Sequence, residues 1–237
     1  MVKNIEAAIA EEKVYIHERL NGIDSSLTER LAPYGYDALD EYFADKRAYL
    51  FAQWKPELYV TDIAVFPETV ADAIANRKHG IYMVNYDGVC AWCGRENQVD
   101  RDLCKELGVR VVELRHNGGV IVSSENDVDI MIIAPMTYGL TRMDFMEKYH
   151  EILSAHFPDA EIVDNDILIG GKKVVGMATG SVNDVFMIVT HVSFTNYSEL
   201  IDKICNKKSE KEPGFVDDTV FTRDEMVEEV LSWLQKR

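Results

Sequence analysis

Residues 165–191 read NDILIGGKKVVGMATGSVNDVFMIVTH, and this stretch decides the kind of fold that the chain can adopt. Short apolar runs rich in β-branched residues alternate here with turn signals. They predict strands over Glu161–Ile169, Lys173–Ala178 and Val185–Phe194, joined by Gly170-Gly171 and by a polar turn. Because short turns rather than helices connect these strands, we expect them to pair antiparallel.

Upstream of this stretch, strand signals and helix signals alternate. A strand over Leu58–Val65 leads into a short helix that Pro67 opens. Two further strands, Ile81–Tyr86 and Val89–Cys93, flank Asp87-Gly88, which predicts a β-hairpin. The other expected elements are a helix around Arg101–Leu107, strands at Val109–Arg115, Val120–Ser124 and Val128–Ala134, and helices at Met143–Phe157, Ser198–Asn206 and Arg223–Gln235.

Two further segments show no pattern that suggests chemistry. Residues 1–57 have apolar positions at helical spacing and predict an N-terminal helical extension, which leaves 58–237 as the main domain. Lys207–Asp218 is rich in lysine and acidic residues and predicts an exposed, mobile loop. Together the elements predict an α/β fold of the α+β type, in which mixed, mostly antiparallel sheets are covered by helices.

The overall charge and the apolar runs narrow the choice of partners. The 237-residue chain has 41 acidic residues against 25 lysines and arginines, a net charge of −16, and its basic residues form no stripe. Such a surface repels phosphate backbones, so nucleic acid is not expected as a partner. The longest apolar runs, Ile130–Met136 and Val185–Thr190, are too short to span a bilayer, so a membrane is not expected either. Since the charged N-terminus does not resemble a secretory signal, we expect a cytoplasmic protein.

The cysteine pattern favours packing over metal binding. Cys90 and Cys93 form a Cys-x-x-Cys pair, but no second Cys or His pair at ligand spacing completes a zinc site. Residues three apart on a strand point to opposite faces, so the pair is badly placed for one metal ion. We therefore predict that Cys90 and Cys93 are buried free thiols, and the other two cysteines of the chain are Cys104 and Cys205.

Glycines, cations and acids recur in an order that suits phosphate and acyl chemistry. Paired glycines such as Gly118-Gly119 let backbone N–H groups approach an oxyanion, and Arg115 beside them supplies a planar, bidentate charge. A lysine on a strand, such as Lys173, offers a compact charge where a phosphorus centre becomes more negative, and Asp166 is a candidate Mg²⁺ ligand. Each of these signals alone is more typical of a turn or a hairpin. The ordered set favours a site.

In order and spacing, these motifs resemble those of the lipoate–protein ligase A family, within the biotin/lipoate ligase superfamily. That family has Gly-Arg-x-Gln-Asn after a strand and then Arg-Arg-x-Ser-Gly-Gly-Gly, where this chain reads GREN at 94–97 and LRHNGGV at 114–120. The family continues with Asn-Asp, a Lys-(Val/Ile)-x-Gly-x-Ala run and a histidine on the next strand. Here the corresponding residues are Asn165-Asp166, KVVGMA at 173–178 and His191. The resemblance covers residues 58–235 and makes 58–237 a lipoate ligase-like catalytic domain.

The resemblance implies a ligase that uses ATP and Mg²⁺ to adenylate lipoate or a similar carboxylic acid, and then transfers the acyl group to a lysine of an acceptor protein domain. Lys173 would be the catalytic residue and would contact the carboxylate and the α-phosphate. Asn165 and Asp166 would bind phosphate and Mg²⁺, and His191 would lie near the acyl pocket. The other implied substrate-binding or ATP-binding residues are Arg95, Arg115, Asn117, Gly118, Gly119, Gly176 and Ala178.

Several departures from the family pattern leave two alternatives open. Leu114 stands where the family has the first arginine, and Val120 stands where it has the third glycine. A non-catalytic protein that keeps the fold and binds a ligand is therefore one alternative. An octanoyl or lipoyl acyltransferase of the same superfamily is another, although such enzymes use a cysteine nucleophile and no cysteine follows His191 on its strand.

Overall fold

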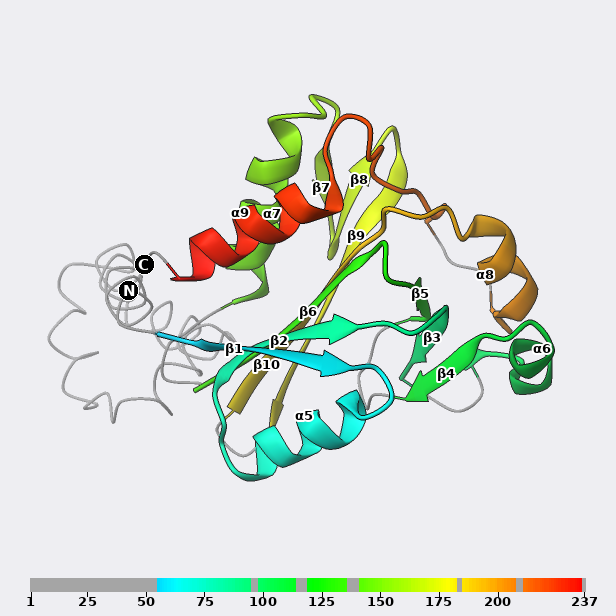
Figure 1. Cartoon of the computed structure of the whole chain (residues 1–237). Coiled ribbons are helices and arrows are strands. Elements are labelled where there is room, and N and C mark those ends of the chain that lie inside the picture. The colour runs from blue at the N-terminus through cyan, green and yellow to red at the C-terminus, as the bar shows by residue number, and fades with distance from the viewer. Residues whose placement is uncertain are drawn as a thin grey trace, which may run out of the picture.

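The computed structural model describes residues 55–94, 98–113, 119–135, 141–182, 185–207 and 211–235. Within them, a seven-stranded sheet and a three-stranded sheet are packed together and covered by helices (Figure 1). This arrangement confirms the predicted class of mixed, mostly antiparallel sheets covered by helices. Residues 1–54 of the predicted N-terminal extension lie outside the described residues, so that extension stays a prediction.

The large sheet has the strand order β1-β2-β6-β10-β9-β8-β7. Only β1 and β2 run parallel, with α5 as the connection between them, and every other neighbouring pair is antiparallel. The strands are β1 (Glu57–Asp62), β2 (Gly80–Asn85), β6 (Val128–Pro135), β7 (Glu161–Val163), β8 (Asp166–Ile169), β9 (Lys172–Val182) and β10 (Val185–Val192).

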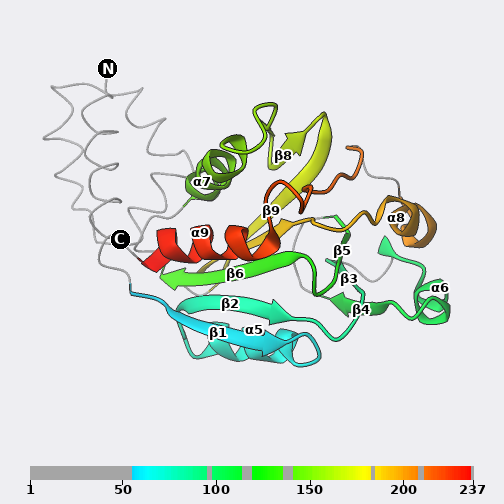
Figure 2. The same ribbon diagram turned by 45° about the horizontal axis from the view of Figure 1, so that its top comes forward.

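Helices α7 (Arg142–Ser154) and α9 (Arg223–Gln235) cover one face of the large sheet (Figure 2). Their aromatic residues meet edge to face, with 5.1 Å between the ring centroids of Phe145 and Trp233, and they pack on β6 residues such as Ile130. Helix α7 starts with a capping box in which Thr141 and Asp144 satisfy each other's backbone N–H groups. This layer forms the larger apolar core.

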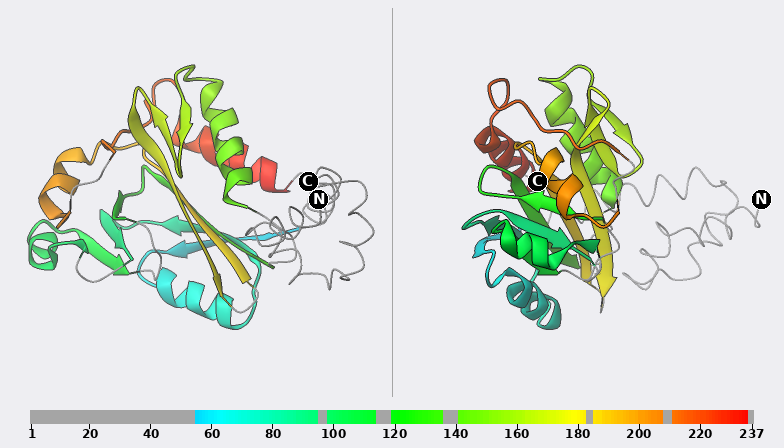
Figure 3. Two further views of the ribbon diagram at one scale, coloured as in Figure 1. Left: turned by 180° about the vertical axis from the view of Figure 1, so that it is seen from behind. Right: turned by 90° about the vertical axis from the view of Figure 1, so that its right-hand side faces the viewer.

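Helix α5 (Phe66–Ala75) and the small sheet cover the opposite face, so the long strands β9 and β10 run between two layers (Figure 3). The rings of Phe66 and Trp92 meet edge to face at 5.3 Å between centroids. Because both faces of β6 are covered, Met131 and Ile133 are buried on this side while Ile130 packs on the other. A strand buried on both faces reads as one apolar run, as the sequence of β6 does.

The small sheet has the order β4-β3-β5, formed by β4 (Arg110–Glu113), β3 (Cys90–Cys93) and β5 (Ile121–Ser123). Helices α6 (Arg101–Glu106) and α8 (Ser198–Ile204) cover its outer side, where Cys104 and Ile204 pack against Cys93. None of the helices in the described part of the chain is long and apolar enough to cross a membrane.

The hairpin predicted at Asp87-Gly88 is wrong. β2 pairs with β1 and with β6, so both of its edges are already occupied. β3 pairs instead with β4 and β5 in the other sheet. The turn at Asp87-Gly88 therefore carries the chain from one sheet to the other, and this transfer is what brings the small sheet over the face that holds the candidate site.

The segment predicted as an exposed loop over Lys207–Asp218 is a loop in its described part, and Glu212, Asp217 and Asp218 are exposed, but the segment is anchored along β9. The Lys173 N–H donates to the Glu212 carbonyl at 2.9 Å, and the Gly214 N–H donates to the Lys173 carbonyl at 2.8 Å. Val216 is fully buried. The last pair of β10 with β9 joins Val192 and Val175, so the edge of β9 beyond that point is open and this segment occupies it.

Candidate active site

One row of residues crosses four strands of the large sheet and sets the plan of the site. Asp129 of β6 is opposite His191 of β10, His191 is opposite Gly176 of β9, and Gly176 is opposite Asp166 of β8. Directly opposed residues on antiparallel strands project from the same face of a sheet. The register therefore aligns a carboxylate, an imidazole, a position without a side chain and a second carboxylate on the face that the small sheet covers.

At one end of this row, Asp166 holds two lysines, and we call these three residues the lysine cluster. The Nζ atoms of Lys173 and Lys211 lie 2.8 Å from different carboxylate oxygens of Asp166. Lys211 also donates to the Val163 carbonyl at 2.7 Å and pairs with Asp164 at 3.2 Å. Burial lowers the pKa of Lys211, but the hydrogen bonds and charges of Asp166 and Asp164 outweigh that effect and raise it. Both cations are therefore held by one carboxylate.

Gly176 makes room for Lys173. A Cβ atom at position 176 would lie 3.0 Å from both Cε and Nζ of Lys173, which is closer than such atoms ordinarily approach. The lysine side chain thus crosses β9 directly over the glycine to reach Asp166. The Gly in the KVVGMA run is needed for this close approach and not for an unusual backbone conformation, since its φ is not positive.

At the other end of the row lies a buried hydrogen-bonded set that we call the histidine network, made of Tyr86, Trp92, Ser123, Asp129, His191 and Ser193. His191 Nδ1 lies 3.0 Å from Asp129 Oδ1, and His191 Nε2 lies 2.8 Å from Ser193 Oγ. His191 is only 4% exposed and Asp129 only 6%. The Ser123 hydroxyl donates to the second oxygen of Asp129.

Two aromatic residues extend the network away from the pocket. The Tyr86 hydroxyl donates to Asp129 Oδ2 at 2.6 Å and accepts from Trp92 Nε1 at 2.9 Å. Burial, followed by the charge of Asp129, raises the pKa of Tyr86 well above its usual range, so its proton stays in place as a donor. Asp129 is thereby held by three donors and fixes the orientation of the imidazole.

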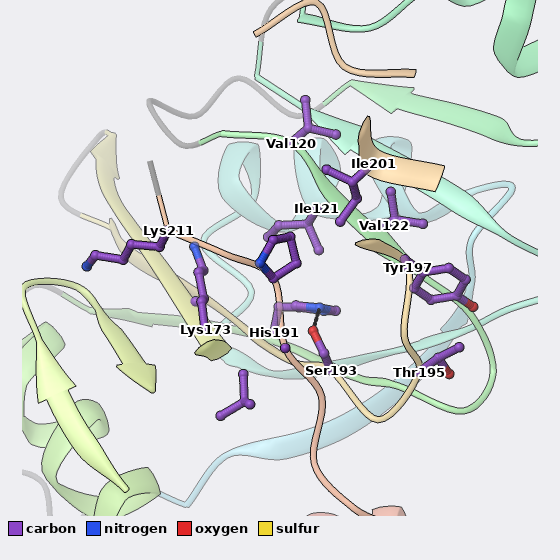
Figure 4. Close-up of a pocket in the computed structure, with 14 residues that line it drawn as sticks. Val120, Ile121, Val122, Lys173, His191, Ser193, Thr195, Tyr197, Ile201 and Lys211 are labelled. Atoms are coloured by element: carbon purple, nitrogen blue, oxygen red, sulfur yellow. Dashed lines mark hydrogen bonds between the residues drawn. The ribbon is translucent and has the colours of Figure 1, made fainter. Parts of the chain in front are cut away.

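The lysine cluster and the histidine network meet in one pocket, seen in Figure 4. The space within it that a water-sized molecule can occupy is about 60 Å³. Lys173, Lys211, His191 and Ser193 supply polar groups, whereas β5 and α8 supply an apolar wall. That wall is formed by Val120, Ile121, Val122, Tyr197 and Ile201. In its chemistry this lining suits a molecule with an apolar body and an anionic head.

The structure brings some of the predicted site residues together and places others elsewhere. Lys173, Gly176 and His191 line the pocket, and Asp166 is in contact with Lys173. Asn165 is exposed at the β7–β8 turn, and Ala178 and Gly119 do not line the pocket. The remaining predicted residues, which are Arg95, Arg115, Asn117 and Gly118, lie outside the described residues.

Sequence reasoning missed several pocket and network residues, of which Lys211, Ser193 and Asp129 are the most instructive. Lys211 lies in the segment that charge patterning predicted to be a solvated loop, and nothing local marks it as part of a site. Ser193 follows His191 by two residues, a spacing that places both on one face of an extended chain. Asp129 did carry a signal, because it is a lone acid in the apolar run VDIMIIAP, where a buried charge needs partners.

Cys90 and Cys93 are buried free thiols, as predicted, while Cys104 is a buried and Cys205 a half-buried free thiol. Burial raises the pKa of the Cys90 thiol to about 12 and that of Cys205 to about 11. Because the thiolate is the nucleophile of cysteine chemistry, these two side chains are poorly suited to attack an acyl group. They serve the packing of the small sheet.

The described residues do not form a protein cage for Mg²⁺. Among them, no group of three or more His, Cys, Asp or Glu side chains is placed to hold a metal ion. Both carboxylate oxygens of Asp166 are engaged by ammonium groups, which repel a divalent cation. In this arrangement Asp166 serves as an anchor for the two lysines. The Mg²⁺ role of Asn165 and Asp166 stays a prediction, and no step below depends on it.

Comparison with known proteins fits this geometry. Residues 90–232, more than half of the chain, match the family model described as lipoyl protein ligase A/B catalytic domain. The chain therefore belongs to the lipoyl protein ligase A/B catalytic domain family. No curated protein sequence matches it.

Solved structures of lipoate ligases share the fold at low sequence identity. LipL1 of P. falciparum, in complex with lipoate, has a TM-score of 0.62 at 13% identity over 76% of this chain. The present chain spans only 62% of that protein. A bipartite lipoate protein ligase from Thermoplasma acidophilum, described with its E2 lipoyl domain, has a TM-score of 0.61 at 16% identity over 77% of this chain and 84% of its own. A lipoate-protein ligase A bound with ATP has a TM-score of 0.57 at 16% identity over 76% and 85%.

Proposed function

We propose that this protein adenylates lipoate or a similar carboxylic acid with ATP and transfers the acyl group to a lysine of an acceptor protein. The observation that carries the proposal is the place of Lys173. It lies over Gly176 at the mouth of a pocket that has an apolar wall, and it is paired with a carboxylate from the next strand. Membership of the lipoyl protein ligase A/B family supports the same chemistry.

The cations suit the first half-reaction. A carboxylate oxygen of the acid attacks the α-phosphorus of ATP, pyrophosphate leaves, and an acyl-adenylate remains. Negative charge gathers around the phosphorus in the transition state, and a lysine ammonium placed there stabilises it. The Lys173 side chain is 34% exposed, so it can leave Asp166 for an incoming anion. Lys211, which is bound to the same carboxylate, adds a second positive charge nearby.

The second half-reaction is the attack of an amine of the acceptor lysine on the acyl carbonyl, with AMP as the leaving group. The apolar wall from β5 and α8 favours an acid with an apolar chain over a small polar acid. Related proteins have been described with lipoate, with ATP and with a lipoyl domain, which supports lipoate and an acceptor domain as the partners to test first. Reduced thiols suit the cytoplasm that we expect.

The test is pyrophosphate release by the purified chain with ATP, Mg²⁺ and a panel of lipoate, octanoate and biotin. We expect release with an apolar-chain acid, and a loss of about 10²–10³-fold in Lys173→Ala, the scale seen when one transition-state donor is removed. Lys172→Ala is the matched control, because that lysine pairs with Glu212 at 2.7 Å and is 53% exposed. Absence of release with every acid, from protein shown to be folded, would overturn the proposal.

A non-catalytic ligand-binding protein is the second candidate. Leu114 and Val120 stand where the family has a cation and a glycine, and both changes weaken phosphate binding. Calorimetric binding of lipoate without any pyrophosphate release would support this candidate. Turnover that Lys173→Ala abolishes would exclude it.

A further inference from the structure

Two pocket residues, His191 and Ser193, lie in line with the buried carboxylate of Asp129, and the proposed adenylation does not use these three groups together. Asp129 Oδ1 lies 3.0 Å from Nδ1 of His191. On the other side of the same ring, Ser193 Oγ lies 2.8 Å from Nε2 (Figure 4). We propose that Ser193 is a nucleophile, activated by His191 and oriented through Asp129, which takes the acyl group from an activated donor and holds it as an acyl-serine ester.

The carboxylate decides which nitrogen of His191 carries the proton. Asp129 at Nδ1 favours the tautomer with hydrogen on Nδ1, and this leaves the lone pair of Nε2 toward Ser193. The Ser193 hydroxyl then donates to Nε2, as a serine must in order to lose its proton to a histidine. Because Tyr86 and Ser123 also donate to Asp129, the carboxylate is fixed and the imidazole with it.

Ser193 can be reached from the pocket, whereas Ser123, the other serine of the histidine network, cannot. Ser123 Oγ also lies 3.3 Å from His191, but on the Nδ1 side that faces Asp129, and Ser123 is fully buried. Ser193 is half-buried and lines the pocket together with Lys173 and the apolar wall. An acyl chain on that wall would present its carbonyl to Ser193, while the nearby ammonium groups favour the negative charge that develops on the carbonyl oxygen.

The chemistry balances without a further reactant beyond an activated acyl donor, either an acyl-adenylate or an activated ester. Ser193 Oγ forms a bond to the acyl carbon as its proton moves to His191 Nε2. The tetrahedral intermediate collapses and expels either the alcohol, which takes up that proton, or AMP, after which His191 releases the proton to solvent. An amine of the acceptor then attacks the ester, its proton passes to Nε2 and on to Ser193 Oγ, and an amide is released.

The test uses p-nitrophenyl octanoate without ATP, so that it does not depend on adenylation. We expect a stoichiometric burst of p-nitrophenol and a gain of one octanoyl group in the intact mass, mapped to Ser193 by peptide mass spectrometry. Ser193→Ala should lose the burst and the label. Ser193→Cys should keep the label at position 193, and this retention guards against a variant that merely misfolds. His191→Gln should acylate about 10²–10⁴-fold more slowly.

Ser154→Ala is the control, since its hydroxyl only bonds the Glu151 carbonyl within α7, and it should label like the parent protein. The inference fails if the label is absent, maps elsewhere, or persists in Ser193→Ala. It rests on the proposed function only for the class of acyl group, and the two can fail separately. Pyrophosphate release without an acyl-serine would support the ligase and exclude the acyl-serine step. An acyl-serine without pyrophosphate release would support that step and exclude the ATP-dependent adenylation.

Discussion

The histidine network and the lysine cluster share one row of the sheet but are built in opposite ways. Asp129 and His191 are 6% and 4% exposed, and the described polar contacts around them are hydrogen bonds within the protein. The Lys173 side chain is 34% exposed, and solvent screens its pairing with Asp166. One end of the pocket is therefore a fixed frame, and the other can exchange a carboxylate partner for an anionic substrate.

Removal of the central carboxylate should have the largest effect. Asp129→Ala takes away the acceptor of Tyr86, Ser123 and His191 in a buried site, and we expect a loss of about 3–5 kcal/mol in the free energy of unfolding. Asp166→Ala is the matched change in the lysine cluster and should cost less, because the side chains of Lys173 and Lys211 are 34% and 23% exposed and can reach solvent. Urea unfolding of both variants checks this contrast, and equal losses would mean that the two ends do not differ in the way described.

Removal of one hydroxyl from the histidine network should have the second-largest effect on the free energy of unfolding. Tyr86→Phe leaves Asp129 without one donor and Trp92 Nε1 without its acceptor, at an expected cost of about 1–3 kcal/mol. Tyr82→Phe is the control, because that hydroxyl donates to the Lys78 carbonyl at a part-buried site and should contribute only about 1 kcal/mol. Thermal unfolding measures both. A milder effect of Tyr86→Phe than of Tyr82→Phe would contradict the network.

Gly176→Ala should affect the lysine cluster without unfolding the protein. The new Cβ lies 3.0 Å from Lys173 Nζ and displaces a flexible side chain, so stability should change little while kcat/KM for adenylation falls about tenfold, or about 1.4 kcal/mol. In Gly180→Ala the nearest atom is Cε of Met187 at 3.3 Å, and this side chain can move aside. Normal activity is expected there. Equal activity of both variants would contradict the role of Gly176 in making room for the Lys173 side chain.

The sequence could predict the elements better than their pairing. Helix α9 (Arg223–Gln235) begins and ends where its apolar spacing predicts, and Gly108 ends α6 as expected. The hairpin at Asp87-Gly88 failed because turn chemistry reports a local bend, whereas the partner of β3 is decided by β1 and β6, which already occupy both edges of β2. Long-range competition for strand edges leaves no local signature.

The same limit applies to the site. Lys173, Gly176 and His191 could be found because a resemblance of ordered motifs indicated them, and all three line the pocket. Lys211 reaches the pocket only because the segment at 211–216 pairs with the open edge of β9, a consequence of where β10 ends. The charge composition of that segment predicts solvent exposure, so its role is visible only once the sheet is assembled.

Lys211→Met should have the smallest effect of these changes, and it tests whether Lys173 can leave Asp166 for an anionic substrate. Lys211→Met keeps the length of the side chain but removes one of the two cations that Asp166 holds. Asp166 would then attract Lys173 more strongly, and the pocket would offer less positive charge to an anion. We expect the KM for ATP to rise several-fold, on the order of 1 kcal/mol, with little change in stability, and the difference from the parent should shrink as salt screens the charges. Lys203→Met, an exposed lysine near the end of α8, should leave KM unchanged. If Lys211→Met instead lowers stability by as much as Asp129→Ala, the lysine cluster is part of the fixed frame and cannot release Lys173 to a substrate.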